Sequence, residues 1–158
     1  MTRHTVATVL LLALAGCVGE AKRPDEGKSA DELRAMLDDA DPHKQAQGAL
    51  GLSRYGRDAL PALPRLAELL HGGDAVVRQQ VALALGKIGP DAVDAVPALT
   101  EALADDEWIV RRQAALALGE IGLPARSALP RLRRLESDPQ TLVRRAAVEA
   151  QGKIRRAQ

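Results

Sequence analysis

The chain has 158 residues, of which 46% are hydrophobic and 27% charged, and its formal net charge is +1. This length suits one ordinary domain, and the apolar and charged fractions together exclude a mostly disordered chain. A single cysteine excludes an internal disulfide bond, and the three histidines lack the spacing of metal ligands. Tyr55 and Trp108 are the only aromatic residues, so a core must be built from Leu, Ala, Val and Ile, which suits helices packed on helices.

The N-terminal segment, 1–16, has the features of an export signal. Arg3 precedes an apolar run at residues 6–15, and small residues stand directly before Cys17. A basic start, a short apolar run and small residues at a cleavage point are typical of a signal peptide, and this run is short for a membrane span. The sequence LAGC at residues 14–17 resembles the lipobox of bacterial lipoprotein signal peptides. That resemblance implies cleavage before Cys17 and lipidation of Cys17; an ordinary secretory signal with an incidental cysteine is the alternative.

Residues 17–29 follow as the lipidated cysteine and a flexible tether, because they are small, charged and without apolar periodicity. A lipid on Cys17 implies a protein of the bacterial cell envelope that is anchored to a membrane. Val18 stands where an aspartate favours inner-membrane retention in enteric bacteria. If the host sorts its lipoproteins by this rule, we expect the outer membrane, with the protein facing the periplasm; the inner membrane is the alternative.

From about residue 41 the chain repeats at a constant interval. The segments VRQQVALALGKIG (77–89), VRRQAALALGEIG (110–122) and VRRAAVEAQGKIR (143–155) align without insertions. The period is 33 residues, the distance from Arg78 to Arg111 and from Arg111 to Arg144. A fixed period of this length is typical of a solenoid. The residues that recur at this period are Arg78, Arg111 and Arg144; Gly86, Gly119 and Gly152; and Pro64, Pro97 and Pro130. The repeat domain, residues 30–158, divides into a half repeat at 30–40, three repeats at 41–73, 74–106 and 107–139, and a C-terminal capping helix at 140–156.

Each repeat has the pattern of two helices. In the second repeat, residues 75–87 predict a first helix that ends near Gly86 and Gly89, and residues 94–104 predict a second helix. Asp94 and Ser127 are candidate N-caps of second helices, with a proline in the first turn. Asp41 and Asp138, each followed by proline, give the same signal for first helices.

The patterns VRxxA, ALGxIG and AVPAL or ALPRL resemble HEAT repeats, and are most similar to the short HEAT-like repeats of the phycobilin-lyase group. The resemblance implies an all-α fold, a right-handed α-solenoid of about seven helices whose second helices line a concave surface. It does not imply one function, because this repeat occurs in scaffolds, lyase-related proteins and DNA-repair enzymes.

The two ends of the array look like caps. Residues 30–39 match a second helix alone, and the last unit stops after its first helix. In that helix Glu149 stands where the earlier repeats have Leu83 and Leu116, and Gln151 stands where they have Leu85 and Leu118. Polar residues at seam positions predict a capping helix with water on its outer side.

The sequence contains no catalytic constellation, glycine-rich phosphate loop or metal cluster, and we expect no cofactor. Carboxylates such as Asp105 and Glu120 are expected to be solvated or to cap helices. The recurring Arg78, Arg111 and Arg144 allow two interpretations, a row of anion ligands or structural bonds to turn carbonyls and carboxylates, and the second is favoured because they recur with the core pattern.

The charge distribution indicates a binding surface. Residues 17–104 hold 10 basic and 14 acidic side chains, whereas residues 105–158 hold 11 and 7. On the second helices this predicts a groove that is acidic to neutral at one end and basic at the other, with a plain solvated surface as the alternative. Candidate partner-binding residues are Arg65, Glu68, Glu101, Arg126, Arg131, Arg133, Arg134 and Trp108, and Arg144 and Arg145 would extend the basic patch. Trp108 is either an anchor for a partner or a cover for a helix end.

Two classes of function remain. The first is a lipid-anchored, non-enzymatic scaffold that binds an acidic surface of another protein, with anionic lipid headgroups as a rival ligand. The second is an enzyme or enzyme accessory similar to lyase-type or DNA-glycosylase-type HEAT-like proteins. We expect no nucleic-acid partner, because export separates the protein from nucleic acid and aromatic platforms for base stacking are scarce. The scaffold is therefore favoured.

Overall fold

The computed structural model describes residues 27–156, and that part of the chain is entirely helical, with no strand. It contains eight α-helices, close to the expected seven, and four short 3-10 helices. The α-helices are α1 (Ala30–Met36), α2 (Pro42–Leu52), α3 (Leu63–Leu69), α4 (Ala75–Ile88), α5 (Val96–Ala102), α6 (Trp108–Ile121), α7 (Leu129–Arg134) and α8 (Thr141–Arg156). The 3-10 helices are η1 (Gly56–Ala62), η2 (Gly89–Ala95), η3 (Leu123–Ala128) and η4 (Leu135–Ser137).

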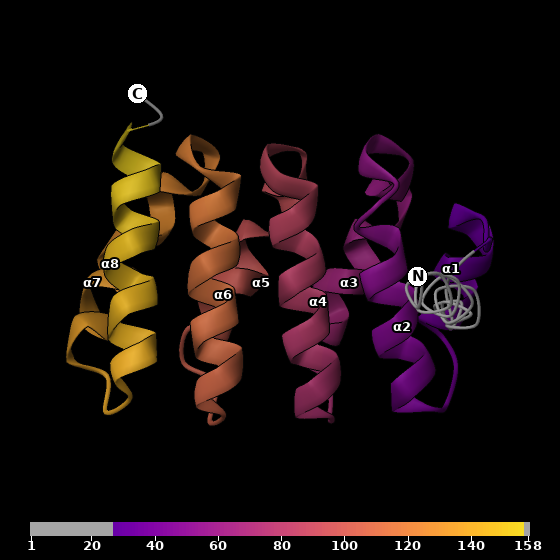
Figure 1. Ribbon diagram of the computed structural model, residues 1–158, viewed down its shortest axis with the longest axis horizontal. Helices are drawn as coiled ribbons and strands as arrows, with labels where there is room; N and C mark the ends of the chain where they lie inside the picture. Colours follow the sequence, from indigo (N-terminus) through magenta and orange to yellow (C-terminus); the bar gives the residue numbers. More distant parts are fainter. Residues whose placement is uncertain (1–26, 157–158) are drawn as a thin grey trace, which may run out of the picture.

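The helices form two layers. The first helices of the repeats, α2, α4, α6 and α8, stand side by side in chain order, and the short second helices α3, α5 and α7 lie behind them (Figure 1). Each first helix packs against the first helix of the next repeat and against the second helix that precedes it. The helices α1 and α8 lie at opposite ends of the row. This arrangement is the α-solenoid expected from the sequence.

The core runs along the seam between the layers and is aliphatic. Leu33, Leu66, Leu99 and Leu132, one from each second helix and each one period after the last, are all fully buried. Alanines from the first helices fill the spaces between them, and they let neighbouring helices approach closely. The core therefore repeats with the period of the sequence.

Glycine has two separate roles at the ends of the first helices. Helices α4 and α6 end at Gly89 and Gly122, which adopt φ of +73° and +74°, a left-handed conformation that favours glycine. The helix α4 ends at Ile88 with Gly89 as its C-cap, in accord with the predicted end near Gly86 and Gly89, and Gly86 itself lies inside the helix. A Cβ atom on Gly86 would lie 3.0 Å from the Cα atom of Ala117, so this glycine permits the close approach of α4 and α6.

The predicted caps of the second helices are wrong. Asp94 and Ser127 lie inside η2 and η3, and the residues that precede α5 and α7 are Ala95 and Ala128, which make no side-chain cap bond. The reason is that each 3-10 helix runs directly into the following α-helix, so no extended cap residue is needed. Pro97 does occupy the first turn of α5, as predicted.

The predicted caps of the first helices are half correct. Asp41 caps α2, with its carboxylate accepting from the backbone N–H of His43 and with Pro42 at the first helical position. Asp138 comes before the start of α8 at Thr141 and accepts instead from the N–H of Gln140, at 2.8 Å, within the preceding turn. This aspartate shapes a turn, and its second role is described below.

One predicted water-facing position in the last helix is wrong. The Gln151 side chain is only 4% exposed, and its amide donates to Glu136 Oε1 at 2.7 Å. The position faces η4 of the preceding repeat rather than the free end of the array, so it stays buried. Glu149 is exposed where Leu83 and Leu116 are partly buried, in accord with a polar end face.

Candidate functional site

The recurring arginines bind the turns between repeats. Arg78 donates from Nε to Asp105 Oδ2 at 2.7 Å and from Nη2 to Asp105 Oδ1 at 2.9 Å. Its Nη1 donates to the carbonyl oxygens of Gly72 and Gly73, both at 3.0 Å. One guanidinium therefore joins the turn before its own helix to the turn of the next repeat.

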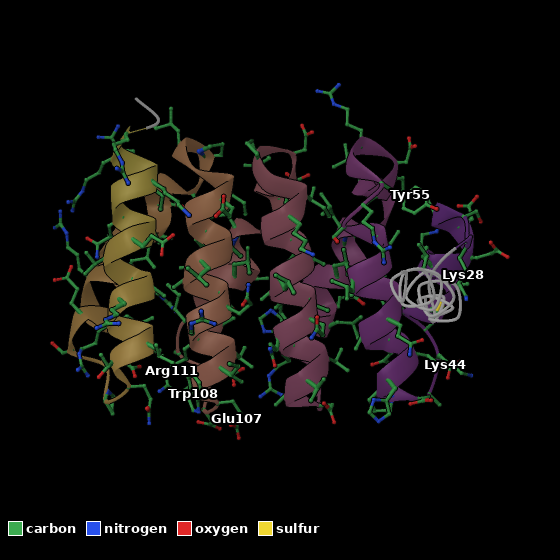
Figure 2. The ribbon with its side chains drawn as sticks, viewed as in Figure 1. Lys28, Lys44, Tyr55, Glu107, Trp108 and Arg111 are labelled. Atoms are coloured by element: carbon green, nitrogen blue, oxygen red, sulfur yellow. The ribbon has the colours of Figure 1, made fainter. Side chains whose placement is uncertain are left out.

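Arg111 repeats this arrangement one unit later. It donates from Nε to Asp138 Oδ2 at 2.7 Å and from Nη1 to the carbonyl oxygen of Asp105 at 2.8 Å. Figure 2 shows Arg111 near the start of α6, with Glu107 and Trp108. We call the series of Arg78, Arg111 and Arg144 with Asp105 and Asp138 the arginine ladder.

The ladder pairs are mostly shielded from water, and this sets the charge state of the aspartates. The side chains of Asp105 and Asp138 are 8% and 7% exposed. Burial acts to raise the pKa of Asp105, but the hydrogen bonds from Arg78 and from the Glu107 N–H outweigh it, so the pKa lies below its ordinary value. The pKa of Asp138 is lowered in the same way through Arg111 and the Gln140 N–H. Both aspartates are therefore held ionised as partners of arginine.

These contacts assign Arg78 and Arg111 a structural role, because their donors are occupied within the chain. The expectation that Asp105 is a solvated or capping residue is wrong, since it is buried against Arg78. The sequence contained a signal that was missed: each aspartate follows its arginine by 27 residues, and both recur with the period of the repeat.

A second group of arginines is free of such bonds. We call Arg126, Arg131, Arg133 and Arg134, which lie on η3 and α7, the basic surface. All four are exposed, whereas the neighbouring Leu132 and Leu135 are buried in the core. Within residues 27–156 no carboxylate forms an ion pair with these guanidinium groups. To other described residues they make one hydrogen bond, in which Arg131 Nη1 donates to the carbonyl oxygen of Thr100 at 3.5 Å.

The two acidic residues proposed for the other end of the groove, Glu68 and Glu101, each lie near a basic side chain of the same molecule. Glu68 Oε2 accepts from Arg65 Nη1 at 2.9 Å, and Arg65 also reaches Asp38 at 2.8 Å. Glu101 Oε2 lies 3.6 Å from His71 Nε2. The arginines on α7 differ from Glu68, because within residues 27–156 no carboxylate pairs with them.

Trp108 is the first residue of α6, and it is partly buried against the hydrophobic core. Figure 2 shows it near the start of the helix, in the layer of first helices. This position is that of a cover for the helix end, and it is in the other layer from α7.

A shallow depression of about 360 Å³ near Glu101 is lined mainly by polar and charged residues, among them His71, Arg78 and Asp105. In residues 27–156 there is no group of three or more His, Cys, Asp or Glu side chains that could hold a metal ion. None of the described helices is both long and apolar enough to cross a bilayer. Cys17, its lipobox and most of the tether lie outside the described residues.

Comparison with known proteins gives a repeat family and several similar folds. A family model of HEAT repeats matches residues 30–118 and 63–151. No curated protein matches the sequence significantly. Among solved structures, human deoxyhypusine hydroxylase in complex with glycerol is 33% identical with a TM-score of 0.64, and the match covers 83% of this chain and 45% of that chain.

Two further structures share the fold. An engineered protein is 25% identical with a TM-score of 0.70, and the match covers 80% of this chain and 64% of that one. The complex of CpcE and CpcF of phycocyanin lyase from a Nostoc species is 21% identical with a TM-score of 0.57, and the match covers 82% and 66% of the respective chains. In every case the chain spans less than two thirds of the protein that it resembles.

Proposed function

The chain belongs to the HEAT-repeat family, and from this premise we propose that it is a non-enzymatic binding scaffold of the bacterial cell envelope. In this proposal a lipid on Cys17 holds the protein at a membrane, and the basic surface docks an acidic surface of another protein. The observation that carries the proposal is the set of four exposed arginines on η3 and α7 that no described carboxylate neutralises.

The chemistry of the basic surface suits an anionic partner. A guanidinium group presents a planar fork of donors that matches a carboxylate or a phosphate. Clustered charges also accelerate association and make it sensitive to salt. Because α7 is fixed to the core through Leu132, which is fully buried, its arginines are presented on a rigid support.

The decisive experiment is recovery of the partner from membranes with the anchored protein. The double variant Arg131→Glu with Arg134→Glu should abolish recovery at low salt. A double variant with the same change in charge at the other end, Arg34→Glu with Arg57→Glu, is the control and should retain it. Equal recovery with both would show that the basic surface is only solvated.

Anionic lipid is the rival ligand for the same arginines. Vesicles with anionic headgroups should bind the wild type no better than they bind the Arg131 and Arg134 double variant. Vesicle binding that is lost in that variant, without a recovered protein partner, would replace the protein partner by lipid.

The anchor is tested separately. Metabolic labelling with a fatty acid should tag the wild type and spare Cys17→Ala, and fractionation should place the wild type in the outer membrane. An exported wild type without label would remove the anchor from the proposal and leave the basic surface untouched.

The second candidate is an enzyme or an enzyme accessory, and one comparison favours it. The match to human deoxyhypusine hydroxylase reaches 33% identity over 83% of this chain, although it covers less than half of the hydroxylase. If the recovered partner is an enzyme whose turnover depends on the presence of this protein, the accessory function replaces the passive scaffold.

A further inference from the structure

The arginine ladder has an unmatched arginine at its C-terminal end. Arg144 makes the local bonds of the series, with Nη1 donating to the carbonyl oxygens of Asp138 and Pro139 at 2.8 and 3.0 Å. Arg78 and Arg111 each also pair with an aspartate 27 residues later. Within residues 27–156 no carboxylate pairs with Arg144, whose Nη2 donates to Thr141 Oγ1 instead.

At its other end the ladder has an aspartate, Asp39, that pairs with a lysine in place of an arginine. Asp39 stands at the repeat position of Asp105 and Asp138, and its Oδ1 accepts from the Asp41 N–H at 2.9 Å, as Asp105 accepts from the Glu107 N–H. The position that would supply its arginine holds Leu12, and its carboxylate pairs with Lys44 at 2.9 Å. The Asp39 side chain is 31% exposed, against 8% for Asp105.

Where the ladder is interrupted inside the chain, both partners are absent together. Gln45 occupies the arginine position of the first repeat and donates to the carbonyl oxygen of Asp39 at 2.8 Å. The aspartate position that it would reach holds Gly72. Arginine and aspartate thus occur as a pair or not at all, except at the two ends of the array.

We propose that a second copy of this chain docks head to tail, with its Asp39 against Arg144 of the first. The repeat register supports this pairing. The residue numbers of the incoming copy can be continued from the first copy by adding four periods of 33 residues. Asp39 of the incoming copy then lies 27 residues after Arg144, the same separation as that between Arg78 and Asp105. The incoming α1 and α2 then follow α7 and α8 as one further pair of helices.

The two end surfaces carry exposed side chains of opposite charge. Asp31, Glu32 and Asp38 are exposed at the α1 end, although Asp31 pairs with Arg34 and Asp38 pairs with Arg65. Arg145, Arg155 and Arg156 are exposed at the α8 end. Gly152 has the position of Gly86 and Gly119, at which the absence of a side chain admits the next first helix.

An apolar contact is also available at this end. Val148 on α8 is 59% exposed, whereas Ala82 and Ala115 at the same repeat position are fully buried. The next residue, Glu149, is charged and pairs with Lys153 at 2.7 Å, so the apolar area around Val148 is small. The association is therefore driven mainly by charge and is weaker at high salt. Because the contact joins different surfaces of the two copies, it leaves one end of each free and builds open chains of copies.

Sedimentation of the full-length chain in mild detergent at low salt tests the proposal. The wild type should self-associate with increasing concentration. Arg144→Gln copies the native Gln45, and Asp39→Asn keeps an acceptor for the Asp41 N–H. Each should weaken association at least about tenfold, because close ion pairs at interfaces are coupled by at least this factor. Unchanged melting of these variants, followed by circular dichroism, shows that α8 stays folded.

Exchange of the charges gives the sharpest control. Arg144→Asp and Asp39→Arg should each remain monomeric alone, whereas an equal mixture of the two should associate because every contact again joins opposite charges. The Arg131→Glu and Arg134→Glu double variant should associate like the wild type, so this proposal and the proposed function can fail separately. A wild type that is monomeric at all concentrations, or association that Arg144→Gln and Asp39→Asn leave unchanged, would overturn the proposal.

Discussion

Three glycines at the same repeat position should respond in opposite ways to one substitution. Gly86, Gly119 and Gly152 all lie inside α-helices, where replacement of glycine by alanine is intrinsically worth about 1 kcal/mol. At Gly152 the nearest atom to an added Cβ is Nη2 of Arg156, at 3.3 Å, on a flexible side chain that can move away. Gly152→Ala should therefore stabilise the protein by about 0.5–1 kcal/mol.

At the two internal positions the new methyl group meets backbone. A Cβ on Gly119 would lie 2.9 Å from the Cα atom of Ala150, and one on Gly86 would lie 3.0 Å from the Cα atom of Ala117. Relief requires neighbouring first helices to move apart, and overpacking of this kind costs about 1–3 kcal/mol. The free energies of unfolding of Gly119→Ala and Gly86→Ala should therefore lie about 1–3 kcal/mol below that of Gly152→Ala.

Denaturant titration at high dilution, followed by helical circular dichroism, measures these free energies. High dilution keeps self-association out of the comparison. If Gly86→Ala and Gly119→Ala stabilised the protein as much as Gly152→Ala does, the close approach of the first helices would not be the reason for these glycines.

The other predictions use the same denaturant assay. Leu118→Ala empties a fully buried position and should cost about 2–5 kcal/mol, whereas Gln151→Ala should cost about 1 kcal/mol, because it removes the bond to Glu136; equal losses would contradict this assignment. Asp74→Ala removes the cap of α4, whose carboxylate accepts from the N–H groups of Val76 and Val77, and should cost about 1 kcal/mol, while Asp94→Ala should have almost no effect. The pKa of Asp105 is lower in the folded protein than in the unfolded chain, so its ion pair stabilises the fold above about pH 4, and this stabilisation is lost as the pH falls through the pKa of the folded state. Asp105→Asn should therefore reduce the acid-side dependence of the free energy of unfolding on pH, and an unchanged dependence would refute the role of the ion pair.

The sequence predicted the repeat and the two-layer packing because both depend on a periodic pattern of apolar residues. Leu33, Leu66, Leu99 and Leu132 fix the second-helix layer, and their spacing is visible without any structure. The limits of the helices were less predictable. Asp94 has the chemistry of a cap, yet η2 precedes α5 and leaves it no amide to bind.

The side-chain bonds between repeats were the least predictable feature. Arg78 and Asp105 lie 27 residues apart, so their contact does not follow from the helical spacing within one element. Gln151 was misplaced for a related reason: a polar residue at a leucine position indicates water, but here Glu136 lies within reach and supplies a buried partner. The basic surface was predictable as a set of exposed arginines, because Leu132 and Leu135 fix which side of α7 faces the core.

Each first helix packs mainly on helices of its own and adjacent repeats, and this arrangement affects how the chain folds. The ladder bonds close loops of 27 residues, and the principal helix contacts join adjacent repeats. A topology with such short loops has a low contact order and folds fast, with each repeat serving as a template for the next. A chain that is made from its N-terminus can thus fold from α1 toward α8 as it is synthesised, before its last repeat is complete.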